Sequence, residues 1–257
     1  MRANKRLNFE GRFSAQLAPV DARRVRRRVF LFAGSIVVIL LVWFFLFSAT
    51  WRVANVTVDG THFLSAETVA SMVPAEGSNI FRFNAQASRA TIGALPEVSA
   101  VRIIRKLPRT IAIYVSERTP VLVWKTTQVL YDIDGNGIAF RIVPTGEDIA
   151  GLFVVNDEAN VHVNVGQRVV PTRFVVAYQV MAERLPQIYP DLIDHMEVGE
   201  TVYDLDVYMK DGRRVRFNVL SDVESQLRDL QRIAAQRSDL FTRSVIDLRV
   251  DRWAYIQ

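Results

Sequence analysis

The 257-residue chain contains no cysteine and only three histidines. Without cysteine it can form no disulfide and can offer no thiolate to a substrate or a metal ion. His62, His162 and His195 lie too far apart in sequence to present a helical pair of imidazoles to zinc. A Gly-x-Ser-x-Gly elbow and a glycine-rich phosphate loop are also missing. These absences predict a protein without metal, cofactor or small-molecule substrate, and not an enzyme.

Charged side chains are missing from one long stretch near the N-terminus. The segment from Val29 to Trp51 contains 23 residues without a charge, and 19 of them are apolar. An α-helix of this length spans about 34 Å, which exceeds the hydrocarbon core of a bilayer at about 30 Å. A cleaved signal peptide would have a shorter apolar stretch. We therefore expect a retained transmembrane helix over residues 29–51.

Basic residues are concentrated on one side of this stretch. Six Lys and Arg residues precede it between Arg12 and Arg28, whereas Arg52 alone follows it within twenty residues. This asymmetry predicts a cytoplasmic N-terminus. Residues 1–28 carry nine basic and two acidic residues, or +7, so the other residues sum to +5 minus 7, or −2. Basic residues beside a membrane helix meet anionic lipid, and the expected partner of this arm is the lipid bilayer rather than nucleic acid.

The residues that follow the helix predict a small α+β unit. One strand alternates apolar and polar residues and ends at Gly60. Ser65 and Asn84 are each placed to cap a short helix, and a turn at Pro108 joins two further strands into a hairpin. The expected order of strand, helix, helix, strand, strand covers the segments 53–59, 65–72, 84–95, 98–106 and 110–117.

The remaining residues predict a second, mixed α/β domain dominated by an antiparallel sheet. A helix is expected to begin at Pro171 and to stop at Pro186. The clearest hairpin turns at Asp211-Gly212, and Ser221 with Glu224 forms a capping-box pattern before an amphipathic helix. Strands are expected over 120–125, 128–131, 203–209, 215–219 and 246–250. The fold class is therefore α+β.

Several motifs, in this order, resemble the FtsQ/DivIB family of bacterial cell-division proteins, which carry a POTRA domain behind a single membrane helix. The resemblance implies a cytoplasmic basic arm over 1–28, a transmembrane helix over 29–51, a POTRA domain over 53–120 and a C-terminal β domain over 121–257. The motifs are Val56, Val58 and Gly60; Leu95-Pro96-Glu97-Val98, Val101-Arg102-Ile103 and Pro108; Glu117-Arg118-Thr119-Pro120 with Trp124; Tyr131-Asp132-Ile133-Asp134-Gly135-Asn136-Gly137; and Ile246-Asp247-Leu248-Arg249.

The resemblance also implies a function. A family member is a single-pass protein of the bacterial cytoplasmic membrane at the division septum, with its C-terminal domains in the periplasm or its equivalent. It acts as a divisome scaffold that docks other division proteins and helps to regulate septal peptidoglycan synthesis. The implied partners are bitopic coiled-coil proteins of the FtsB and FtsL kind. The POTRA unit would present an exposed strand face, including Thr110, Ala112 and Tyr114, to further partners.

The C-terminal segment is the candidate partner-binding site. It reads as a terminal strand with Trp253 and Tyr255 on one side and charged residues interleaved, a composition that is common in protein interfaces. A strand at a sheet edge can also bind an extended partner by strand addition, although a plain edge strand would read the same way. The resemblance implies that FtsB binds here, at Arg249, Val250, Asp251, Arg252, Trp253, Ala254, Tyr255 and Ile256.

Three alternative interpretations compete with this one. The first is a calcium loop, because Asp132, Asp134 and Asn136 fit the first half of an EF-hand, but Val143 occupies the position that needs glutamate. We therefore expect a β-turn there. The others are a membrane-anchored signalling or anti-sigma protein, for which a 28-residue arm is short, and an envelope enzyme, for which no catalytic set is evident.

Overall fold

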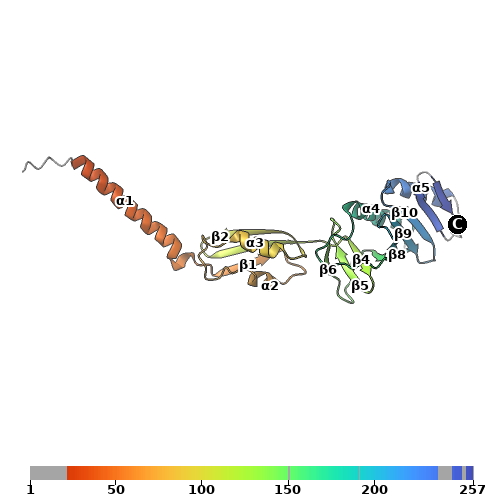
Figure 1. Ribbon diagram of the computed structural model, residues 1–257, viewed down its shortest axis with the longest axis horizontal. Helices are drawn as coiled ribbons and strands as arrows, with labels where there is room; N and C mark the ends of the chain where they lie inside the picture. The colour runs from red at the N-terminus through yellow and green to blue at the C-terminus, as the bar shows by residue number, and fades with distance from the viewer. Residues whose placement is uncertain (1–21, 150, 191, 237–244, 251–252, 257) are drawn as a thin grey trace, which may run out of the picture.

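The computed structural model describes residues 22–149, 151–190, 192–236, 245–250 and 253–256, with the backbone alone for residues 22, 250 and 253–256. In Figure 1 the chain passes from one long helix through a small α+β unit to a larger sheet domain. Two separate hydrophobic cores correspond to these two units. The long helix contributes to neither core.

Helix α1 (Ala22–Phe47) contains residues 29–47 of the uncharged stretch and exposes nearly all of its apolar side chains. Among the described residues it is the one helix long and apolar enough to cross a membrane, over Arg23–Phe47. Within the expected span of 29–51, the α-helix ends at Phe47. The Ser48 hydroxyl accepts a hydrogen bond from the Thr50 amide at 3.2 Å and opens a short 3-10 helix, η1 (Ala49–Trp51), so the α-helical geometry ends first.

The first α+β unit has the order that the sequence predicts. Its sheet runs β1-β3-β2, in which β1 pairs parallel with β3, and β2 pairs antiparallel with β3. The two helices pack on one face of this sheet and enclose the smaller core. The elements are β1 (Asn55–Asp59), α2 (Ala66–Ser71), α3 (Ala85–Gly93), β2 (Val98–Lys106) and β3 (Thr110–Glu117).

Local side-chain chemistry explains where these elements begin and end. The Ser65 hydroxyl accepts from the Thr68 amide at 3.1 Å, which satisfies an amide that α2 leaves unpaired. Asn84 caps α3 in the same way, through the Ala87 amide. Gly60 follows β1 with φ at +89°, and a β-carbon there would lie 2.2 Å from the carbonyl oxygen of Val115. Only glycine fits this turn.

The second domain is built on a nine-stranded sheet with the order β12-β11-β10-β9-β8-β7-β4-β5-β6. Five of its eight neighbouring pairs are antiparallel, and β4–β7, β7–β8 and β10–β11 are parallel. The elements are β4 (Leu122–Thr126), β5 (Val129–Ile133), β6 (Ala139–Ile142), β7 (Val154–Asp157), α4 (Thr172–Ile188), β8 (Ile193–Val198), β9 (Asp204–Met209), β10 (Arg214–Asn218), α5 (Val223–Gln236), β11 (Val245–Val250) and β12 (Trp253–Ile256).

Helices α4 and α5 cover one face of this sheet, and the larger core lies between the two layers. Trp124 of β4 and Phe174 of α4 meet edge to face, with 6.0 Å between their ring centroids. Both side chains are almost fully buried. The other face of strands β8 to β11 carries polar and charged side chains and has no covering helix among the described residues.

Three local expectations were wrong. Pro186 does not stop α4, which continues to Ile188 because Leu185 and Tyr189 are buried against the sheet and hold the last turn in place. Pro171 is the N-cap of α4 rather than its first helical residue. Asp222, not Ser221, caps α5, since its carboxylate accepts from the Glu224 amide at 3.1 Å.

The burial of Phe174 generates a stability prediction. Replacing Phe174 by Ala should lower the free energy of unfolding of the C-terminal domain by about 3–5 kcal/mol, because the substitution leaves a cavity beside Trp124. Denaturant unfolding of the detergent-solubilised chain, followed by tryptophan fluorescence, measures this change. Val176→Ala is the matched control, since Val176 lies on the same helix and is 53% exposed. Equal effects of both substitutions would contradict the packing described above.

Candidate functional site

The predicted partner-binding segment falls on the last two strands of the sheet. Strand β12 is the outermost strand and pairs antiparallel with β11, with Ile246 opposite Ile256 and Asp247 opposite Tyr255. Among the described residues, no strand pairs with its outer edge. Asp251 and Arg252 lie outside the described residues, as do the side chains of Val250 and of Trp253, Ala254, Tyr255 and Ile256.

Arg249 is anchored within the domain. Its guanidinium lies 2.7 Å from the Asp247 carboxylate and 3.2 Å from the Asp204 carboxylate. Burial raises the pKa of Asp247, but the hydrogen bonds from Arg249 outweigh this effect and keep that pKa below its usual value. Arg216 adds a longer contact to Asp247 at 3.9 Å. Charged side chains therefore connect β9, β10 and β11 across the open face.

The same open face contains a carboxylate pair that the sequence did not reveal. Glu158 follows β7 and Glu197 lies in β8, two strands that are neighbours in the sheet. A hydrogen bond to Glu197, together with burial and the charge of Glu197, raises the pKa of Glu158. These two residues border a polar hollow that is also lined by Asp206, Arg214 and Arg216. Because 39 positions separate the two glutamates in the sequence, only the parallel pairing of β7 and β8 brings them together.

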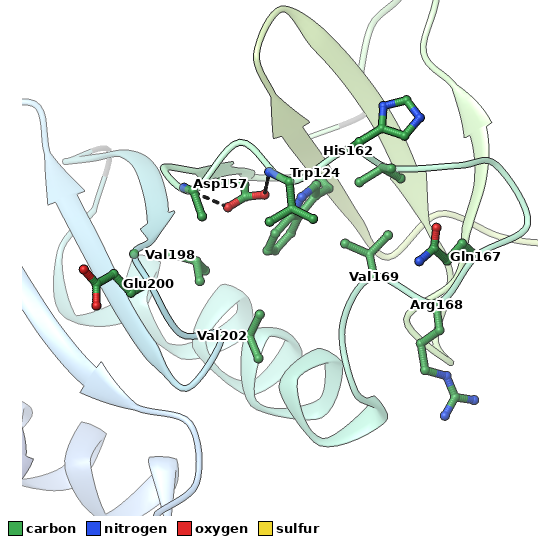
Figure 2. Close-up of a pocket in the computed structure, with 13 residues that line it drawn as sticks. Trp124, Asp157, His162, Gln167, Arg168, Val169, Val198, Glu200 and Val202 are labelled. Carbon is green, nitrogen blue, oxygen red and sulfur yellow. Dashed lines mark hydrogen bonds between the residues drawn. The ribbon is translucent and has the colours of Figure 1, made fainter.

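Beside the sheet lies a more apolar pocket of ≈ 150 Å³, shown in Figure 2. Trp124 and several valines line it, and charged residues stand at its rim. The Asp157 carboxylate accepts from the amides of Ala159 and Val161 at 3.1 and 3.0 Å, so it serves the loop that forms one wall. The residues that line this pocket form a recess that suits an apolar side chain. They do not include a nucleophile paired with a base.

A third feature joins the two domains. Arg118, directly after β3, donates to the carboxylate of Asp134, which lies in the turn between β5 and β6. Asp134 also accepts from the amides of Asn136 and Ile138, each at 2.9 Å. Burial raises the pKa of Asp134, but these hydrogen bonds together have the larger effect and bring the pKa below its usual value. One carboxylate thus shapes a turn of the second domain and ties it to the first.

A neighbouring contact reinforces this joint. Glu117, the last residue of β3, accepts from the backbone amides of Phe63 at 2.7 Å and of Leu64 at 3.0 Å. The ring of Phe63 then packs against Phe140 and lies 4.1 Å from the guanidinium of Arg141, both in the second domain. Glu117 therefore holds the loop that carries Phe63 into the contact between the domains.

Comparison with known proteins identifies both units. Residues 51–118 match the family model for the FtsQ-type POTRA domain, and residues 122–249 match the model for the C-terminal part of cell division protein FtsQ/DivIB. This chain belongs to the FtsQ/DivIB family of cell-division proteins. The expected order of one apolar helix, a POTRA domain and a sheet-rich α/β domain is confirmed.

The sequence identity to individual relatives is modest. The chain is 33% identical to cell division protein FtsQ of Chloroflexus aurantiacus over 128 residues, which is 49% of this chain and 46% of that protein. It is 32% identical to FtsQ of Chloroflexus aggregans over 157 residues, or 60% of this chain and 57% of the relative. The FtsQ of Dinoroseobacter shibae is 26% identical over 205 residues, or 78% and 63%. The chain thus spans about half the length of the first two relatives.

Several residues of the motifs that resemble the FtsQ/DivIB family have structural roles in this chain. Glu117 and Arg118 belong to the exit motif of the POTRA domain, and both form the joint between the domains. Asp134 and Gly137 belong to the aspartate-glycine turn. Gly137 has φ at +79°, and a β-carbon there would lie 1.9 Å from the carbonyl oxygen of Val170. The expected β-turn is confirmed, and its aspartates are bound by arginine and by backbone amides.

The strand face predicted to meet partners of the POTRA domain, at Thr110, Ala112 and Tyr114, is only partly exposed. Ala112 is fully buried in the central strand β3, so it cannot contact a partner. Tyr114 is half-buried, and its ring lies 5.0 Å from the guanidinium of Arg102 and 5.5 Å from the ammonium of Lys106. The accessible part of this face is therefore basic.

The joint between the domains generates a second prediction. Arg118→Ala and Asp134→Ala should each destabilise the chain, and a double-mutant cycle should give a coupling free energy of about 0.5–3 kcal/mol. Because the pKa of Asp134 is lowered in the fold, its contribution is present above the ordinary carboxyl pKa of about 4 and is lost as the pH falls through the folded pKa. Denaturant unfolding at pH 7 and at successively lower pH measures both effects.

The same substitutions should loosen the joint without unfolding either domain. Because the chain has no cysteine, spin labels can be placed at Gln86→Cys in the POTRA domain and Glu183→Cys in α4, two exposed positions. Electron paramagnetic resonance should show a broader distance distribution in Asp134→Ala. Asp211→Ala, which breaks an ion pair inside the second domain, is the matched control. An unchanged distribution in Asp134→Ala would contradict the role assigned to this ion pair.

Proposed function

We propose that the chain is a divisome scaffold that docks other division proteins through the edge of its C-terminal sheet and so helps to regulate septal peptidoglycan synthesis. The observation that carries this proposal is the position of β12 as the outermost strand of a nine-stranded sheet. The outer N–H and C=O groups of such a strand can pair with an extended segment of another chain. In this proposal the protein itself catalyses no reaction.

The docking site consists of β12 and the end of β11. Main-chain hydrogen bonds along the strand supply affinity, and alternate side chains supply specificity. Arg249 lies at the start of this site, where Asp247 and Asp204 hold its guanidinium. The partner is a bitopic coiled-coil protein of the FtsB kind, paired with one of the FtsL kind. The proposed contact residues are Arg249, Val250, Asp251, Arg252, Trp253, Ala254, Tyr255 and Ile256.

The proposal also places the chain in the membrane. Helix α1 crosses the bacterial cytoplasmic membrane once, with the N-terminus in the cytoplasm and both folded domains outside it at the division septum. The five arginines between residues 23 and 28, in the first turns of α1, and the scarcity of basic residues directly after the helix support this orientation. The boundaries 1–28, 29–51, 53–120 and 121–257 then separate the arm, the membrane segment, the POTRA domain and the docking domain.

Two aromatic residues test the docking site. The double substitution Trp253→Ala and Tyr255→Ala should strongly reduce co-purification of the FtsB-like partner from dividing cells, because aromatic side chains commonly dominate interface energies. The circular dichroism of the purified chain should stay unchanged. Tyr203→Ala is the matched control, since Tyr203 is a 39% exposed aromatic residue of the same domain. Undiminished co-purification of the double variant would refute the assignment.

The orientation is tested by cysteine labelling, for which the cysteine-free chain is well suited. Ser14→Cys lies in the basic arm and Glu200→Cys at an exposed position of the second domain. In cells with an intact cytoplasmic membrane, an impermeant maleimide should label position 200 and should leave position 14 unlabelled until the membrane is opened. The reverse pattern would overturn the proposed orientation.

A further inference from the structure

The end of helix α1 is held by the POTRA domain. Only seven residues separate Phe47, the last residue of α1, from Asn55, the first of β1. The side-chain amide of Asn79 donates to the carbonyl oxygens of Phe45 at 2.8 Å and Leu46 at 3.0 Å. Carbonyls in the last turn of a helix have no partner within the helix. A residue of the POTRA domain thus satisfies them, and the two elements are attached directly.

Aromatic side chains strengthen this attachment. The ring of Trp51 lies 5.0 Å from Phe45 and 5.2 Å from Phe81, measured between ring centroids. Phe45 and Phe81 also meet edge to face at 5.8 Å. Aromatic rings are favoured at the level of lipid head groups. The loop that carries Asn79 and Phe81 therefore lies level with the C-terminal end of α1.

The tip of the β2–β3 hairpin is brought to the same end of the domain. The carbonyl oxygen of Arg109 accepts from the amides of Ala54 at 2.8 Å and Asn55 at 3.2 Å. The guanidinium of Arg109 donates to the carbonyl oxygen of Arg52 at 3.3 Å. Leu107, at the tip of the hairpin, leaves 58% of its surface exposed. Three separate segments of the chain thus converge around the end of α1.

These segments are rich in basic residues. We call Arg52, Arg82, Arg105, Lys106 and Arg109 the junction rim. All five side chains are exposed, and none of them forms an ion pair with a carboxylate among the described residues. The segments 51–54, 76–83 and 105–109 contain one acidic residue, Glu76. The exposed apolar residues Phe81 and Leu107 lie among these charges in the sequence.

We propose that the junction rim binds the head groups of anionic phospholipids in the leaflet where α1 ends. Guanidinium and ammonium groups attract and hydrogen-bond phosphate, and basic residues next to a membrane helix gain attraction from an anionic surface. Phe81 and Leu107 supply apolar contact with the same leaflet. The POTRA domain is thus docked on the bilayer as well as tethered to it. This inference rests on the proposed membrane span, whereas it is independent of the proposed docking strand.

The test uses the full chain in lipid nanodiscs. A single cysteine at Leu107→Cys carries an environment-sensitive fluorophore, and the nanodiscs contain head-group spin-labelled lipid as a quencher. Ala94→Cys is the control position, because Ala94 is exposed and follows α3 towards the opposite end of the domain. With phosphatidylglycerol in the nanodisc, quenching at 107 should clearly exceed quenching at 94. In pure phosphatidylcholine this difference should shrink.

Charge removal supplies the second arm. The combination Arg52→Gln, Arg82→Gln and Lys106→Gln should reduce the ratio of docked to undocked POTRA domain by about fivefold for each basic residue removed. The combination Arg89→Gln, Arg184→Gln and Lys210→Gln removes the same charge at exposed positions outside the rim and should leave quenching unchanged.

Each other outcome has a definite meaning. Equal quenching at 107 and 94 would overturn the docking. Quenching at 107 that stays the same when the lipid charge is changed, or when the three rim substitutions are made, would overturn it too. A rim that serves another protein would also give this result, because no partner is present in the nanodisc. Failure of the chain to enter nanodiscs at all would refute the membrane span instead. The two proposals therefore fail in different ways.

Discussion

The ion pair between Arg118 and Asp134 is the constraint on which the relation of the two domains depends. Asp134 is bound at the same time by two amides of its own turn, so the turn that starts β6 and the joint between domains share one carboxylate. Glu117, one residue away, fixes Phe63 against the second domain. A change at this joint would therefore alter the placement of the whole sheet relative to the POTRA domain.

On the far side of the joint, the two faces of the C-terminal sheet differ in composition. Helices α4 and α5 bury one face, and the core around Trp124 and Phe174 holds the domain together. The other face is crossed by ion pairs from β9 to β11, which include Arg249 and Asp247. These ion pairs hold β11 in place, and β11 is the strand that pairs with β12. The position of the edge strand therefore depends on ion pairs as well as on the core.

The sequence predicts those features that depend on nearby residues. Ser65 and Asn84 cap helices through amides three residues ahead, and Asp211-Gly212 forms its turn locally. The short strands β6, β7 and β8 were missed. Strand β7 pairs in parallel with two strands that are distant in the sequence and has no turn signal of its own. For the same reason the carboxylate pair of Glu158 and Glu197 could not be foreseen. The edge position of β12 was expected, whereas its partner-binding role stays a prediction.

The hydrogen bonds from Asn79 to the end of α1 have a consequence for encounters between proteins in one membrane. A flexible linker would let the outer domains sample many heights and directions, and a second anchored protein would rarely meet them in a suitable pose. A stiff attachment restricts this search to sliding and rotation within the plane of the bilayer. For a partner anchored in the same bilayer, such restriction raises the effective concentration of its binding segment at the sheet edge. Even a modest intrinsic affinity would then give a well-populated complex.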